Sequence, residues 1–330
     1  MRKIVICMFL AAFCLQSFAQ NAVDSLYIDT RVAFHLESVP GETVTKFQGD
    51  HLNLNIWGHI APNVDYRLRQ RLNKQVFDAR NIFNATDFLY VNWHATDKLR
   101  LMVGKQAVLI GGYEYDAVPI DVYFYSQFCN NLYQGFTMGA SLYYRFMEGQ
   151  DVIFQFCDSP LSLGFENVYA YNLAWSGSFA PWWHTIWSTN FVQDRDSRFV
   201  NYVSLGNHFT FGNILFDLDV MNRAGIGQRS SLILSDYTVI SKFIWSVGKW
   251  NICWKAGYER NEPWNVDASG RPYDEVILPG TEYLYGGAGL EYFPMGDNNL
   301  RLHAVYYRDN SRSRNNFEFG VTWRLDIIKR

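Results

Sequence analysis

Three arginines recur at every second position within one short stretch of the chain, residues 65–74. Alternate residues of a β-strand point to the same face, so Arg67, Arg69 and Arg71 would form a ladder with a spacing of about 6.6 Å. Guanidinium groups stay charged at any relevant pH, and their forked donors match the oxygens of phosphate and carboxylate groups. The spacing therefore predicts a wall that attracts anions. The alternative is that these arginines neutralise acids on adjacent strands.

A longer segment, residues 111–133, mixes acids with many aromatic residues. It begins Gly-Gly-Tyr-Glu-Tyr-Asp and therefore contains Glu114 and Asp116. Because so much aromatic area favours burial, we expect the segment to fold inward, with these carboxylates opposite the arginines. Two more cations, Lys105 and Arg145, lie in the strands predicted before and after it, and we expect them near the arginine ladder. The alternative is an outward loop that packs on its neighbours.

The remaining polar residues form no recognisable catalytic or metal-binding motif. The sequence has no Gly-x-Ser-x-Gly, no His-Glu-x-x-His, no phosphate-binding glycine loop and no cysteine pairs at zinc spacing. His184 and Ser188 would share a strand face, but four residues along a strand span about 13 Å, beyond hydrogen-bond reach. We therefore expect no enzymatic activity, no cofactor and no metal.

The first residues have the pattern of a secretory signal. Arg2 and Lys3 precede an almost wholly apolar run over 4–15, and Ser17-Phe18-Ala19 fits a small-x-small cleavage site. We expect cleavage of residues 1–19, which leaves one mature domain over 20–330. An uncleaved anchor is disfavoured because the apolar run is short for a membrane helix.

Composition indicates a membrane protein of an unusual kind. Aromatic residues make up 17% of the chain, yet the mean hydropathy is −0.15. Alternating lipid-facing and water-facing residues cancel in such an average, and interfacial girdles use many aromatics. Without Arg2 and Lys3, the 29 basic residues become 27 against 32 acidic ones, a net charge of −5. That balance gives no argument for a nucleic-acid partner.

Three cysteines remain in the mature chain, at positions 129, 157 and 253. An odd number does not describe a disulfide framework. Cys129 and Cys157 could form a disulfide, or all three cysteines could be free thiols; the sequence leaves both alternatives open.

The elements that must hold these residues are strands. Odd and even positions differ in polarity along most of the mature chain, as in 316–325, where Phe, Phe, Val, Trp and Leu alternate with polar residues or glycine. About ten tilted residues of this kind cross a bilayer. The pattern predicts a transmembrane antiparallel β-barrel of sixteen strands, with 14 or 18 as alternatives. The predicted strands are 26–38, 49–60, 65–73, 87–95, 99–110, 134–146, 151–158, 167–178, 183–194, 198–211, 214–222, 235–247, 250–260, 282–293, 300–309 and 316–327.

Short and mostly longer connections alternate between these strands, as periplasmic turns and external loops do in barrels. An even strand count then places both termini on the turn side. The charged side of each strand, such as Asp217 and Asp219, should face the lumen, because a charge in hydrocarbon costs about 2–4 kcal/mol. A barrel of this size leaves room for an aqueous channel. The longer connections are predicted at 39–48, 74–86, 111–133, 159–166, 195–197, 223–234, 261–281 and 310–315.

Three short motifs resemble those of the phosphate-selective porin O and P family: residues 66–74, 103–106 and 111–116. The strand arrangement resembles that of sixteen-stranded general porins, whose third external loop folds inward to form a constriction. The resemblance implies a trimeric porin with a pore lined by arginine and lysine, which favours anions. Carried over by motif, it points to Arg67, Arg69, Arg71 and Lys105.

We therefore expect an outer-membrane porin, surrounded by lipid, through which small hydrophilic solutes and anions diffuse passively. Opposed charges at the constriction would give a mild ion preference, toward anions if the arginine ladder dominates. Cation preference, led by the loop acids with Asp217 and Asp219, is the alternative. A ligand-specific receptor, or a structural barrel without an open channel, is the alternative function.

Overall fold

The computed structural model describes residues 22–73, 82–132, 135–161, 166–226, 228, 234–311 and 313–329. The predicted signal peptide, residues 1–19, lies outside them. No helix within these ranges is long and apolar enough to cross a membrane. The helical segments are η1 (Ile82–Ala85), α2 (Tyr113–Asp116), η2 (Pro119–Asp121) and α3 (Gln127–Asn131). The strands are β1 (Ser25–Val39), β2 (Glu42–Ala61), β3 (Val64–Arg71), β4 (Thr86–His94), β5 (Leu99–Ala107), β6 (Phe136–Met147), β7 (Gln150–Asp158), β8 (Tyr169–Ala180), β9 (Trp183–Gln193), β10 (Phe199–Phe211), β11 (Ile214–Gly225), β12 (Asp236–Val247), β13 (Trp250–Asn261), β14 (Glu282–Tyr292), β15 (Leu300–Asp309) and β16 (Arg314–Lys329).

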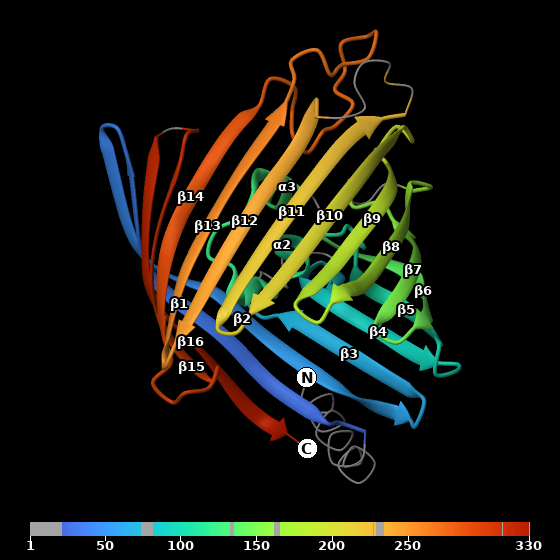
Figure 1. Ribbon diagram of the computed structural model, residues 1–330, viewed down its shortest axis with the longest axis horizontal. Coiled ribbons are helices and arrows are strands. Elements are labelled where there is room, and N and C mark those ends of the chain that lie inside the picture. Colours follow the sequence, from blue (N-terminus) through green and yellow to red (C-terminus); the bar gives the residue numbers. More distant parts are fainter. Residues whose placement is uncertain are drawn as a thin grey trace, which may run out of the picture.

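The strands form one closed barrel in which each strand pairs with its neighbours along the chain (Figure 1). The last strand closes on the first, with pairs that run from Ser25 and Lys329 to Ser38 and Asn315. Closure removes the open edges that a sheet cannot expose to hydrocarbon. The predicted fold class, a sixteen-stranded antiparallel barrel, is confirmed. The start of β1 and the end of β16 lie at the end of the barrel that carries the short turns.

The two faces of the barrel differ in polarity, as the sequence pattern predicts. On β13, Trp254 is 45% exposed on the outside, whereas Glu259 is fully buried inside. On β15, Leu302 is 44% exposed, and the next residue, His303, is 5% exposed. Because successive side chains of a strand point to opposite faces, one apolar and one polar wall follow from the sequence.

The predicted loop at 39–48 is wrong. β1 and β2 continue as a hairpin with only Pro40 and Gly41 between them, and the pairing extends to Val39 and Glu42. Residues 42–49 are all exposed. This part of the hairpin therefore meets water on both faces. A strand in that environment has no one-sided apolar pattern, which is the signal used to find the others.

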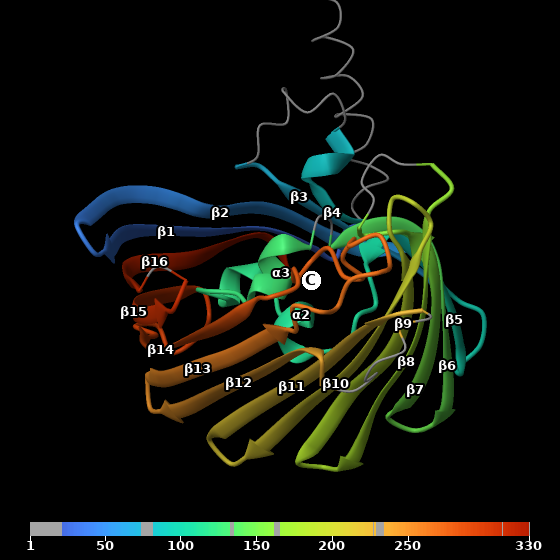
Figure 2. The same cartoon turned by 90° about the horizontal axis from the view of Figure 1, so that it is seen from above.

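The connection between β5 and β6 folds into the barrel, as predicted. Figure 2 shows α2 and α3 inside the ring of strands. Phe128 and Leu132 of this connection pack with Val276 and Ile277 of the β13–β14 connection and with Tyr202 of the wall. All five are less than a tenth exposed. A dry apolar core therefore fills part of the lumen.

Two of the three mature cysteines contact this apolar core. Cys157 belongs to the core, and Cys129 packs against it; both are free thiols. Burial raises the pKa of the Cys129 thiol well above its ordinary value. The disulfide that the sequence left open is not formed in the structure.

A charge placed on the outer wall should destabilise the barrel in proportion to its depth. Leu173, 48% exposed, lies midway along β8, whereas Val247, 44% exposed, lies beside the turn that ends β12. Leu173→Arg should lower the free energy of unfolding by about 2–4 kcal/mol and Val247→Arg by about 0–1 kcal/mol. Urea unfolding in lipid vesicles measures both. Equal losses would contradict the assignment of these faces to lipid.

Candidate functional site

The inward β5–β6 connection is held by carboxylates that project from the barrel wall. Asp219 on β11 accepts hydrogen bonds from the backbone amides of Tyr113 and Glu114, each at 2.8 Å. Glu259 on β13 accepts in the same way from the first two amides of α3. The first amides of a helix have no partner within it, and an anion satisfies them well. Two lumen acids, Asp219 and Glu259, therefore anchor the connection.

Two arginines from other strands hold the middle of the same connection. Arg31 on β1 donates to the carbonyls of Ile120 and Val122, at 3.2 and 3.0 Å. Arg301 on β15 also donates to the carbonyl of Ile120, at 3.0 Å. With anchors on β1, β11, β13 and β15, the connection crosses the lumen and narrows it.

Glu114 faces a cation, but not the cations that we expected. Its carboxylate, 8% exposed, forms an ion pair with Lys255 on β13 and accepts from the amide of Ser126 at 3.0 Å. Burial raises the pKa of the Glu114 carboxyl, but Lys255 and the Ser126 hydrogen bonds outweigh it and hold the pKa below its ordinary value. Glu114 therefore forms its ion pair with Lys255 and not with the arginine ladder, because Asp219 fixes the start of α2, although Glu114 borders the same cavity as Arg71.

Asp116, the other predicted loop acid, ends α2 and is exposed. Within the described part of the chain, no cation lies within ion-pair distance of it.

The arginine ladder exists, but its members have different environments. Arg69, 4% exposed, and Arg71 both pair with Asp87 on β4, at 2.9 and 2.8 Å. Arg67 is half-buried and stacks on the ring of Phe88, 4.4 Å from its centroid. No carboxylate among the described residues lies within ion-pair distance of Arg67. Three guanidiniums and one carboxylate leave this wall with a net charge of +2.

Lys105 does not continue the ladder. Although its Cα pairs with those of Leu89 and Met138 on the outer face, Lys105 is only 3% exposed. Its ammonium donates to the carbonyl of Phe83 in η1. Because β5 ends at Ala107, Lys105 lies at the rim and also borders the external cavity described below.

Arg145 also lies away from the ladder. It stands near the end of β6, beside the turn to β7, and pairs with Asp151 at 3.0 Å. The side chain is 53% exposed. The expectation that it lies near the ladder at the narrowest part is corrected, because the inward connection starts from the opposite end of the neighbouring strand, β5.

Two cavities flank the inward connection. The external cavity, about 430 Å³, is bordered by Arg71 and Asp87 on the ladder side. The periplasmic cavity, about 270 Å³, is bordered by Asp217 among others on β11–β15. Glu114 and Ala117 border both cavities. The narrowest part of the lumen therefore lies at α2.

Sequence reasoning missed the residues that position this constriction. Lys255, Arg31 and Arg301 are charged residues on lumen faces, which the alternation does reveal, but their partners on the inward connection lie more than 85 residues away in sequence. Only the lumen-facing charge itself was a signal, and it does not identify the partner. Asp87 is left unpaired by a bulge between β3 and β4, and alternation with Leu89 and Val91 would have placed it outside.

The chain is similar to known proteins in part of its sequence and in its fold. The family model of the phosphate-selective porin O and P family matches residues 44–182, from β2 to the turn after β8. No curated protein matches the chain. A trimer form of OmpT, an outer membrane protein of Vibrio cholerae, is 12% identical, covers 92% of this chain and 99% of its own, and superposes with a TM-score of 0.60. A triple mutant of the Rhodopseudomonas blastica porin is 12% identical, covers 91% and 99%, and gives a TM-score of 0.54.

Over residues 44–182 the chain resembles the phosphate-selective porin O and P family, and its fold is that of outer-membrane β-barrel proteins. The solved structures share the fold, and at 12% identity they show the fold alone. The family model spans the arginine ladder and the inward connection, whereas the anchors on β11, β13 and β15 lie beyond it.

The Asp219 anchor can be tested without a measurement of transport. Asp219→Ala should speed amide hydrogen exchange at Tyr113 and Glu114 by roughly 10- to 150-fold, because hydrogen bonds to a charged group contribute about 1.5–3 kcal/mol. Asp217→Ala is the matched control, since Asp217 shares the strand and the face but bonds His208 at 2.6 Å. Equal acceleration in the two variants would argue against a specific anchor.

Proposed function

We propose that this porin is a passive channel for small hydrophilic solutes and ions in the outer membrane, with a modest preference for anions. The observation that carries the proposal is the pair of cavities that meet at α2, inside a closed barrel with a charged lumen. The proposal is for diffusion and not for catalysis.

The anion preference rests on the unequal charges at the constriction. The ladder wall keeps a net charge of +2, whereas Asp219 is already bonded to amides and Asp217 to His208. Arg67 and Arg71 are the ladder arginines that remain partly exposed. A guanidinium can donate two hydrogen bonds to one oxyanion, so phosphate would be favoured among anions. Asp116 opposes this preference and keeps it modest.

Assembly and export complete the proposal. A homotrimer is supported by the trimer form of a protein with the same fold and by the apolar outer wall. Removal of residues 1–19 as a signal peptide is supported by their composition. The molecular mass in mild detergent and the N-terminus of the mature protein test these two points.

Purified protein in a planar bilayer should produce steady ohmic conductance steps, because the lumen offers a hydrated path on both sides of α2. The measurement is the single-channel current at a series of positive and negative voltages. Membranes that stay closed at every voltage would favour a receptor or a structural barrel instead.

Ion preference should follow the exposed ladder arginines. Arg67→Gln and Arg71→Gln should each lower the anion-to-cation permeability ratio by about three- to four-fold, since one charge about 6 Å from an ion contributes about 0.4 kcal/mol after screening by salt, with opposite signs for anions and cations. Asp87→Asn should raise the ratio. The measurement is the zero-current potential across a KCl gradient.

Arg145→Gln is the matched control, because it removes the same charge beside the periplasmic turn rather than at α2. It should leave the potential nearly unchanged. A potential that moves with Arg145 but not with Arg67 or Arg71 would mean that the ladder is purely structural.

A further inference from the structure

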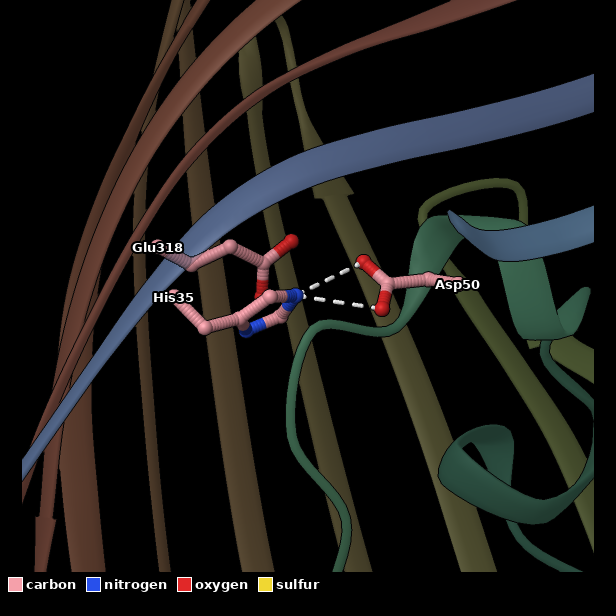
Figure 3. Close-up of side chains that lie close together, drawn as sticks. All are labelled: His35, Asp50 and Glu318. Carbon is pink, nitrogen blue, oxygen red and sulfur yellow. Dashed lines mark hydrogen bonds and ion pairs between the residues drawn. The ribbon is translucent and has the colours of Figure 1, made fainter. Parts of the chain in front are cut away.

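Three residues from three strands bring metal-ligand atoms together in the external half of the lumen. His35 on β1, Asp50 on β2 and Glu318 on β16 each offer one ligand atom, and these atoms lie within 4.8 Å of one another. Figure 3 shows the Asp50 carboxylate facing the His35 ring, with the carboxylate of Glu318 next to the same ring. Within the described residues, this is the one group of three or more such ligands.

Local strand geometry explains why these side chains converge. His35 and Glu318 are direct cross-strand partners in the β1–β16 pairing. In the β1–β2 pairing, Arg31 opposes His51 and Val32 opposes Gly49, which leaves Asp50 unpaired. Such a β-bulge re-aims a side chain, and bulges are frequent beside functional sites. The bulge turns the Asp50 carboxylate toward His35.

The spacing of the donor atoms suits a small divalent cation. The Nε2 atom of His35 lies 3.1 and 3.2 Å from the two carboxylate oxygens of Asp50. Zinc bonds of about 2.0–2.1 Å in a tetrahedron separate neighbouring ligands by about 3.3 Å. One imidazole and two carboxylates are donors that zinc accepts, whereas magnesium and calcium prefer oxygen ligands alone.

An unpartnered donor beside the cluster also points to a bound ligand. The Nε atom of Arg31 has no hydrogen-bond partner in the described structure, and the side chain is 5% exposed. It lies 3.5 Å from Asp50 and 3.8 Å from Glu318. One of the two terminal nitrogens of Arg31, Nη1, donates to carbonyls of the inward connection. A water on a metal held by the cluster would accept a hydrogen bond from this Nε–H. The two carboxylates and the one guanidinium carry a net charge of −1, which favours a cation.

A further histidine orients one ligand. His303 on β15, which is buried, lies with Nε2 3.0 Å from a carboxylate oxygen of Glu318. Outer hydrogen bonds of this kind fix the direction of metal-binding carboxylates. A cavity of about 410 Å³, which Glu37 and Glu42 also border, leads to His35, Asp50 and Glu318 from the external end of the barrel.

We propose that His35, Asp50 and Glu318 bind one zinc ion that enters from the external side. His35 coordinates as neutral imidazole, and any proton on its Nε2 is released to solvent when the metal binds. Water from the cavity takes the fourth position. Other His–Asp pairs, such as His94 with Asp65 at 2.7 Å, have no third ligand among the described residues and are not expected to bind.

Cobalt(II) is the probe, because it takes zinc sites and its visible absorption reports tetrahedral coordination. Detergent-purified wild-type protein should bind one equivalent of Co²⁺ with such a band. Zn²⁺ should displace it, and a large excess of Mg²⁺ or Ca²⁺ should not. His35→Gln, Asp50→Asn and Glu318→Gln should each weaken binding at least tenfold, in line with the loss expected when a metal site is disturbed. His94→Gln should bind as the wild type does.

A wild-type protein with no saturable absorption band would overturn the proposal. So would a band that persists unchanged in the three ligand variants. Far-UV circular dichroism checks that each variant is folded, and because the three substitutions are on three strands, any folded one decides the matter.

The site also predicts an effect on transport, and this part rests on the proposed function. Zinc adds two positive charges beside Arg31, so external Zn²⁺ should shift the zero-current potential toward anions in wild type and not in His35→Gln. Cobalt binding requires no open channel. A silent bilayer with normal cobalt binding would therefore refute the channel alone, and the reverse result would refute the metal site alone.

Discussion

The whole structure depends on the closure of its hydrogen-bond ladder between β1 and β16. Hydrocarbon offers no partner for an amide or a carbonyl, and each unpaired group there costs several kcal/mol. The pairing from Ser25–Lys329 to Ser38–Asn315 removes that cost for the first and last strands. Once the ladder is closed, each strand has one face in lipid and the other in an enclosed space. Polar side chains then have no place other than the inside.

Confinement of so many charges decides how the lumen is organised. A charge that is buried without a partner is expensive, so most of the interior charges are used in pairs. Arg223, fully buried, pairs with Asp236 and Asp274 at 2.7 and 3.0 Å. Asp219 and Glu259 are satisfied by backbone amides of the inward connection. The lumen acids are thus mainly structural, and what an ion meets is a smaller set of exposed groups.

The inward connection links these structural charges to function. Arg31 and Arg301 hold its middle by hydrogen bonds. Glu114 of its first helix borders both cavities. Arg31 also lies beside the His35, Asp50 and Glu318 cluster. A change of charge in that cluster therefore acts on a residue that holds the constriction. The external vestibule and the narrowest part of the lumen are physically connected through one guanidinium.

The sequence by itself determined the barrel, the strands, the lumen-facing residues and the inward course of residues 111–133. These features follow from a side-chain period of two and from the cost of aromatic area in water, both of which are local properties of the chain. The exposed tip of the β1–β2 hairpin was missed because both of its faces meet water. Only the tertiary structure decided that Glu114 pairs with Lys255, that Lys105 is buried against η1 and that Asp87 pairs with two arginines. The partner of a charge depends on the register between strands, on bulges such as that at Asp50, and on which wall a crossing segment reaches. None of these is set by the residue type or by its neighbours in sequence.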